Sequence, residues 1–180
     1  MLGSTMQLRY DLPLYKYITW VTQLQAGRSF GHSHIQYNLA GLDNNVTVKV
    51  DSNAHAAQNA PYAFQTLVTP FRGYLQNDVY GNYYGVWNSD VYFPLFQSLM
   101  PIETPLLFIN QLQPGLFADL GKAGEIWTNK STNPNNNNWL WSYGASLRSS
   151  LAGYPLRLDV AWRGTFNKKP VWYFTLSKVL

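Results

Sequence analysis

The sequence contains no cysteine, few charges and no long apolar run. Without cysteine, disulfide bonds and thiolate metal sites are excluded, so the fold must depend on packing and hydrogen bonds. Charged residues make up 12%, about half the share of a typical soluble domain. No stretch of about eighteen apolar residues occurs, which excludes an ordinary transmembrane helix. The 13 basic and 9 acidic residues are scattered, so nucleic acid is not an expected partner.

The residues that are abundant are aromatic and uncharged polar ones. Aromatics make up 16% of the chain, and the segments between them are rich in Asn, Gln, Ser, Thr and Gly. This composition is typical of a transmembrane β-barrel, which turns apolar side chains toward lipid and uncharged polar ones toward its lumen. A large soluble β-sandwich is the alternative that composition leaves open.

Apolar and polar residues alternate with a period of two along most of the chain, which predicts β-strands. The alternation is strictest from 156 to 163, where Arg157, Asp159 and Arg163 share one face. A sandwich core could not hold these charges unpaired, whereas a wet barrel interior can. Eight strands are expected, at 6–12, 18–26, 33–39, 83–96, 108–121, 139–151, 156–163 and 171–180.

The alternation mostly lapses between residues 40 and 82, where Asn, Asp, Gln, Ala and Gly predominate. A loop of this length is uncommon in a compact domain unless it has a function, and barrels of this kind carry long loops on one side. A short hairpin arm is expected at 46–50. The first ten residues also lack the basic start and apolar core of a signal peptide, so we expect a mature product or the end of a longer chain.

Three motifs carry a resemblance to a known family. They are Phe71-Arg72-Gly73-Tyr74, the strand-like run from Asn88 to Phe96, and Phe117-Ala118-Asp119-Leu120-Gly121. In this order and spacing, they resemble the (V/I)RG(F/Y) loop tip, the N-x-E-x-R-x-P-L-F strand and the F-x-D-x-G strand of the BamA, TamA and FhaC superfamily. This superfamily is also called the bacterial surface antigen family.

The resemblance implies a fold and a location. We expect an all-β, transmembrane, antiparallel up-and-down β-barrel, with residues 1–180 supplying about eight strands as the carboxy-terminal half of a sixteen-stranded barrel. The implied location is the outer membrane of a Gram-negative bacterium. The expected partners are outer-membrane lipid, the remaining barrel strands or an upstream periplasmic domain, and subunits of a membrane complex.

The resemblance also implies a specific ion pair. Arg72 at the tip of the long loop is expected to fold back into the lumen and pair with Asp119, and Gly73 is expected to pass close to the barrel wall. A bidentate Arg–carboxylate pair is geometrically specific and can fix a long loop. Tyr74 and Gly121 complete these two motifs.

The sequence departs from the family pattern at four positions. Phe71 stands where Val or Ile is usual, Asp90 where Glu is usual and Tyr92 where Arg is usual, and Leu180 ends the chain where an aromatic is commonest. These departures leave the fold expectation in place but weaken the case for transport or insertase activity.

The strand pattern assigns side chains to two faces. The side chains expected to face the lumen are Asn88, Asp90, Arg148, Arg157, Asp159 and Arg163. The side chains expected to face lipid are Trp141, Leu156, Leu158, Val160, Trp162 and Phe174.

Neither catalysis nor cofactor binding is expected. His32 and His34 would share one face of a strand, but the sequence fixes no third metal ligand. No nucleophile elbow or triad spacing occurs, so no enzyme, metal site or cofactor is predicted. Two functions remain: a pore or scaffold of the assembly and secretion class, used in protein transport, or a membrane anchor that transports nothing. A secreted, glycan-binding β-sandwich is a third alternative.

Overall fold

The computed structural model describes residues 2–15, 18–43, 45–46, 62–75, 78–96, 107–125, 138–151, 153–164 and 169–176. Their main element is a sheet of seven strands in the order β1-β2-β6-β7-β8-β9-β10. The strands are β1 (Leu2–Tyr15), β2 (Ile18–Phe30), β6 (Tyr83–Tyr92), β7 (Gln113–Gly124), β8 (Leu140–Leu151), β9 (Tyr154–Arg163) and β10 (Val171–Leu176). Every neighbouring pair is antiparallel, so the predicted up-and-down all-β architecture is confirmed.

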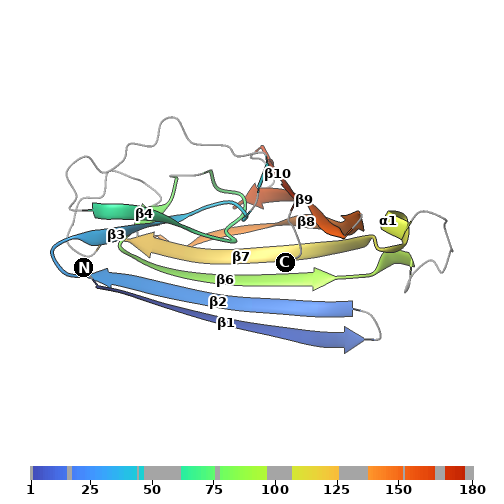
Figure 1. Ribbon diagram of the computed structural model, residues 1–180, viewed down its shortest axis with the longest axis horizontal. Helices are drawn as coiled ribbons and strands as arrows, with labels where there is room; N and C mark the ends of the chain where they lie inside the picture. Colours follow the sequence, from blue (N-terminus) through green and yellow to red (C-terminus); the bar gives the residue numbers. More distant parts are fainter. Residues whose placement is uncertain are drawn as a thin grey trace.

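The two faces of this sheet differ in polarity, as the alternation predicts. Apolar side chains at alternate positions are exposed on one face, which we call the outer face. On the opposite, inner face the side chains are mostly polar, and many of them are buried because the chain between β2 and β6 lies over them (Figure 1). Neighbouring residues illustrate the contrast: Trp141 is 50% exposed, whereas Ser142 is fully buried.

The connection between β2 and β6, residues 31–82, contains a second sheet. Its strands β3 (His34–Leu39), β4 (Tyr62–Val68) and β5 (Tyr80–Gly81) are arranged in the order β4-β3-β5. In Figure 1, β3 and β4 lie on one side of the large sheet. An apolar core joins this connection to the inner face, and it consists of Tyr37, Leu39, Val68, Phe71, Tyr74, Val79, Tyr84, Val86 and Ala123.

The strand expected at 33–39 is therefore present but does not belong to the large sheet. β3 pairs with β4 and β5, and residues Gln36 to Leu39 are all buried. Alternation of apolar and polar residues predicts a strand but does not specify which strands it pairs with. A strand within the loop therefore shows the same alternation as a strand in the wall. The long loop accordingly begins before residue 40.

Several strand boundaries also differ from expectation. β1 and β2 extend beyond the expected 6–12 and 18–26, and β7 extends to Gly124. The strand expected at 83–96 ends at Tyr92, two residues before Pro94. The strand expected at 108–121 begins only at Gln113, because a short helix, α1 (Leu107–Asn110), comes first. No helix within the described residues is long and apolar enough to cross a membrane. Of the expected hairpin arm at 46–50, only Val46 lies within the described residues.

The large sheet is open. In the part of the chain that the structure describes, β1 and β10 are its terminal strands. The two strands run in the same direction, because five strands separate them and each neighbouring pair is antiparallel. The sheet therefore does not close on itself within the described residues.

Candidate functional site: the locked loop

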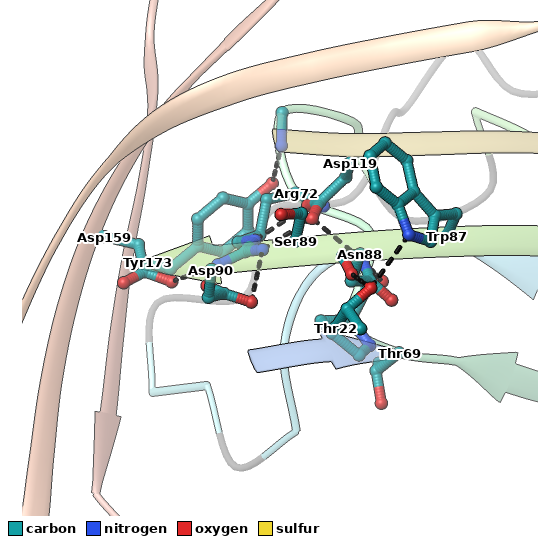
Figure 2. A network of polar contacts seen from close by, with 12 residues as sticks. Thr22, Thr69, Arg72, Trp87, Asn88, Ser89, Asp90, Asp119, Asp159 and Tyr173 are labelled. Carbon is teal, nitrogen blue, oxygen red and sulfur yellow. Dashed lines mark hydrogen bonds and ion pairs between the residues drawn. The ribbon is translucent and has the colours of Figure 1, made fainter. Parts of the chain in front are cut away.

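The side chain of Arg72 is completely buried between the long loop and the inner face of the sheet. It lies at the tip of the connection between β2 and β6, beside carboxylates from three strands (Figure 2). A buried guanidinium is tolerated only when its charge is paired and its N–H groups have acceptors. The surrounding strands supply both.

Asp119 on β7 is the main partner of Arg72. The Arg72 Nε donates to Asp119 Oδ2 at 2.7 Å and Nη2 donates to Oδ1 at 2.5 Å. The backbone N–H of Arg72 also donates to Asp119 Oδ2, at 3.0 Å. The structure thus brings together the two residues that the sequence motifs pair, and the carboxylate binds both the side chain and the main chain of the loop tip.

Two further acids contact Arg72, although the sequence reasoning assumed that one would be enough. Asp90 on β6 accepts from Nη1 at 2.7 Å and from Nη2 at 3.3 Å. Asp159 on β9 lies 3.8 Å from Nη1. Asp90 and Asp159 were expected to face the lumen, but their role as partners was missed because sequence spacing does not show which strands converge on the tip.

The electrostatics of the cluster favour a permanent charge on Arg72. Burial by itself lowers the pKa of the guanidinium, but the nearby carboxylates of Asp119 and Asp90 outweigh it and hold the pKa well above its ordinary value. The Phe117 ring lies under the guanidinium, with Cζ 3.5 Å from the ring centroid. Arg72 is therefore held by ion pairs around its rim and by an aromatic ring on one face.

The loop tip also packs against glycines and polar groups of the wall. Gly73 has a φ of +86°, and a Cβ there would lie 3.0 Å from the Cβ of Ser142. The structure thus places this glycine against the wall, where a side chain would meet β8. A Cβ on Gly121 would lie 2.6 Å from the Phe71 ring, so the glycine of the second motif makes room for the loop tip.

Tyr173 on β10 binds the loop tip through its hydroxyl group. The hydroxyl accepts from the N–H of Gly73 at 2.8 Å and donates to the carbonyl of Tyr74 at 3.1 Å. Sequence reasoning did not identify Tyr173, which was read only as part of an alternating strand. Its position between Trp172 and Phe174 in the alternation assigns it to the inner face, and this is the sequence signal that could have drawn attention to it; the structure shows it buried there.

A second ion pair fixes the loop near its tip. Arg163 Nη1 donates to Asp78 Oδ2 at 2.6 Å, and Asp78 was not among the predicted residues. The Tyr74 hydroxyl donates to the Trp141 carbonyl at 3.3 Å. Burial raises the pKa of Tyr74 to about 12, so its hydroxyl stays protonated at neutral pH.

The remaining residues expected to face the lumen lie on the inner face. Asn88 donates to Asp119 Oδ1 and to the Pro70 carbonyl, so it bridges the pair and the loop. Arg157 pairs with Asp159 at 2.8 Å and with Asp90 at 3.4 Å. Arg148 stacks on Tyr92, with Cζ 3.7 Å from the ring centroid, and Tyr92 in turn donates to Asp90.

The residues expected to face lipid occupy the outer face and differ in exposure. Trp141, Leu158 and Phe174 are exposed by 50%, 39% and 37%. The side chains with intermediate burial are Leu156, Val160 and Trp162. Trp162 is the cross-strand partner of Tyr143, and their rings stack at a centroid distance of 6.3 Å.

The structure offers no metal centre among the residues it describes. No group of three His, Cys, Asp or Glu side chains there is placed to ligate an ion. His32 and His34 therefore gain no third ligand from the described part of the chain. The third histidine of the sequence, His55, lies outside the described residues.

Comparison with known proteins agrees with this geometry. The model of the Omp85 superfamily domain matches residues 28–178. The chain belongs to the Omp85 superfamily. The match covers the end of β2, the long loop and the five strands from β6 to β10. β1 and most of β2 precede the matched region. No curated protein matches the chain.

Membership places the chain in a family of outer-membrane assembly and secretion transporters. The resemblance to BamA, TamA and FhaC is thus confirmed, as is the assignment to a β-barrel type of outer-membrane protein.

Proposed function

We propose that this chain forms part of the wall of an outer-membrane pore or scaffold whose lumen is narrowed by the long loop. The observation that carries this proposal is the complete burial of Arg72 among Asp119, Asp90 and Asp159. Because three strands supply these acids, the tip is fixed to several strands at once. Such a loop shapes the lumen and stiffens the wall.

The proposal requires additional strands to close the wall. Main-chain groups at an open sheet edge cannot remain unpaired in lipid. Since β1 and β10 run in the same direction, a wall that is antiparallel throughout needs an odd number of additional strands between them. Nine would complete a sixteen-stranded barrel, where the sequence reasoning expected eight. We propose that residues 1–180 act as one unit of that barrel, in a Gram-negative outer membrane.

Conductance of the intact protein in planar bilayers tests this proposal. We expect small, stable currents for the native sequence and larger, fluctuating currents for Arg72→Ala, because the loop tip would leave the wall. Arg28→Ala is the matched control, because it also removes an arginine, but one whose side chain is exposed and lies over the Phe30 ring. Absence of current with both the native protein and Arg72→Ala would contradict the proposal that the protein forms a pore.

A non-transporting membrane anchor is the second candidate. The full pairing of Arg72 favours it, because a lock with this many contacts opens only at a high free-energy cost. Neither candidate involves an enzymatic activity. The glycan-binding sandwich is not carried forward, because the exposed outer face is apolar and no second sheet covers it among the described residues.

A further inference from the structure

A hollow of about 490 Å³ lies between the long loop and the inner face of β1 and β2. This volume falls within the range of small-molecule sites, roughly 300–1,000 Å³. Additional strands that close the wall would pair with the main-chain edge of β1 and not with its inner face. The hollow therefore stays open to the lumen when the wall is complete.

The sheet contributes three glutamine side chains to the hollow. Gln7 on β1 lies directly opposite Gln25 on β2, and Gln23 points to the same face two residues away. The Gln25 amide donates to the loop, whereas the amides of Gln7 and Gln23 have no hydrogen-bond partner among the described residues. Each amide offers two N–H donors and one carbonyl acceptor. This side of the hollow can therefore donate and accept hydrogen bonds at neighbouring positions.

The loop contributes hydroxyl groups and one carboxylate. Asp43 accepts from the Thr69 hydroxyl through Oδ1 at 2.6 Å, so its Oδ2 keeps its capacity to accept from a ligand. Thr66 adds a second hydroxyl group from β4. Among the described residues that line the hollow, none is basic and Asp43 is the one acid. The lining thus disfavours phosphates and carboxylates and suits a ligand that carries hydroxyl groups.

Tyr37 places a buried polar group without a partner beside the hollow. It is 2% exposed, and its hydroxyl oxygen has no hydrogen-bond partner among the described residues. Its ring packs against Tyr84 at a centroid distance of 4.8 Å, and both tyrosines line the hollow. An unsatisfied buried hydroxyl costs about 1–3 kcal/mol. A hydroxyl-bearing ligand in the hollow can remove this cost by supplying the partner.

We propose that the hollow is a binding site for a neutral, soluble saccharide. A sugar ring carries hydroxyl groups that both donate and accept at its edge, and apolar C–H groups on its faces. The glutamine amides, the threonine hydroxyls and Asp43 match the edge, whereas Leu67, Val68 and Tyr84 supply apolar surface for the faces. The sugar of a membrane glycolipid is a poorer match, because its acyl chains would have to lie on the lipid side of the wall.

The inference rests on the proposed function only in that the inner face borders an aqueous lumen. It does not depend on whether that lumen conducts. Binding would replace water in the hollow and leave the Arg72 cluster on the other side of the loop intact.

Saturation-transfer NMR of maltose tests the site, with the intact protein in a detergent that has no sugar head group. We expect transfer to maltose but not to glucose 6-phosphate, whose charge the lining does not match. Lipopolysaccharide should not displace maltose. Equal transfer to the two sugars, or no transfer to maltose, would overturn the proposal. Displacement by lipopolysaccharide would overturn the choice of a soluble saccharide.

Two variants locate the binding. Gln7→Ala with Gln23→Ala should weaken maltose binding about tenfold, because several hydrogen bonds are lost. Gln113→Ala, which removes an exposed glutamine elsewhere on the sheet, is the matched control and should bind as the native protein does.

Tyr37→Phe removes only the hydroxyl group. We expect severalfold weaker binding without any loss of resistance to unfolding, because the hydroxyl has no protein partner to lose. A purely structural role for Tyr37 would instead lower stability and leave the affinity unchanged. Native affinity in both Tyr37→Phe and the double glutamine variant would overturn the site, while bilayer conductance tests the proposed function independently.

Discussion

The long loop binds the two sides of the sheet in different ways. Toward β6–β10, it is fixed by the Arg72 cluster, the Arg163–Asp78 pair and the Tyr173 hydroxyl. Toward β1 and β2, the Gln25 amide donates to the Thr69 carbonyl at 2.8 Å, and the Ser29 hydroxyl is within 3.3 Å of the carbonyls of Ile35 and Asn82. No ion pair between described residues joins the loop to this side, and an open hollow of about 490 Å³ remains beside Gln25. The hollow is lined mainly by uncharged polar side chains, including Gln7, Gln23 and Thr66.

This difference shows where charge can fix a loop. Ion pairs are strong only where water is excluded and every charge has a partner, as around Arg72. In a wet hollow, amides exchange protein partners for water at little cost. The loop is therefore best described as a plug fixed to one side of the wall, with hydrated space on the other.

Removal of the Arg72 side chain should have the largest effect on how firmly the loop is held by β6–β10. Arg72→Ala leaves three acids close together in a buried site, which costs about 3–5 kcal/mol by analogy with other broken buried pairs. We expect rapid proteolysis of the connection between β2 and β6. Arg28→Ala, which removes an exposed arginine, should leave the digestion pattern unchanged, and equal resistance of the two variants would contradict the account.

Neutralising Asp119 should have a smaller effect. In Asp119→Asn, the guanidinium keeps Asp90, so the expected loss is about 1.5–3 kcal/mol, the range for hydrogen bonds to charged groups. Denaturant unfolding followed by the fluorescence of a probe on the loop would measure it. A loss as large as that of Arg72→Ala would mean that Asp90 contributes nothing to the lock.

High pH should loosen the tip through Tyr74. The folded-state pKa of about 12 exceeds the ordinary value of 10.0, so the stabilisation is complete below pH 10 and is lost as the pH rises toward 12. Arg163 and Asp78 are the charged groups that act on this hydroxyl. Tyr74→Phe should show a weaker loss of protease resistance between pH 10 and 12 than the native chain, and identical profiles would count against this assignment.

Substitutions on the side of the loop that faces β1 and β2 should have the smallest effect. Gln25→Ala removes the hydrogen bond to Thr69, for which about 0.5 kcal/mol is expected because water in the hollow can replace the amide. Hydrogen exchange should stay slow at the N–H of Arg72. Release of the loop tip by Gln25→Ala would contradict the conclusion that the loop is held mainly by β6–β10.

Local sequence patterns predicted the wall well and the loop poorly. The alternation in β9 correctly separates Leu158 from Asp159, because the face of a strand residue depends only on its position. The same pattern placed 33–39 in the wall, although β3 lies in the loop sheet. Contacts between residues far apart in the sequence decide which strands pair. The alternation of apolar and polar residues carries no information about these contacts.

The candidate site shows the same division. The motifs paired Arg72 with Asp119 and placed Gly73 against the wall. They gave no indication of Tyr173, about a hundred residues from the tip, or of Asp78 as the partner of Arg163. Such partners depend on the inward curvature of the sheet and on the path of the loop over it, which only the three-dimensional arrangement specifies.

The most direct test of the lock is the free-energy coupling between Arg72 and Asp119. Arg72→Ala, Asp119→Ala and the double variant would be compared by the free energy of loop release, measured as protease protection. We predict that the double variant is no less stable than Arg72→Ala alone, because removing Asp119 then also removes repulsion with Asp90 and Asp159. If the two single losses add in the double variant, Arg72 and Asp119 act independently and the lock does not exist.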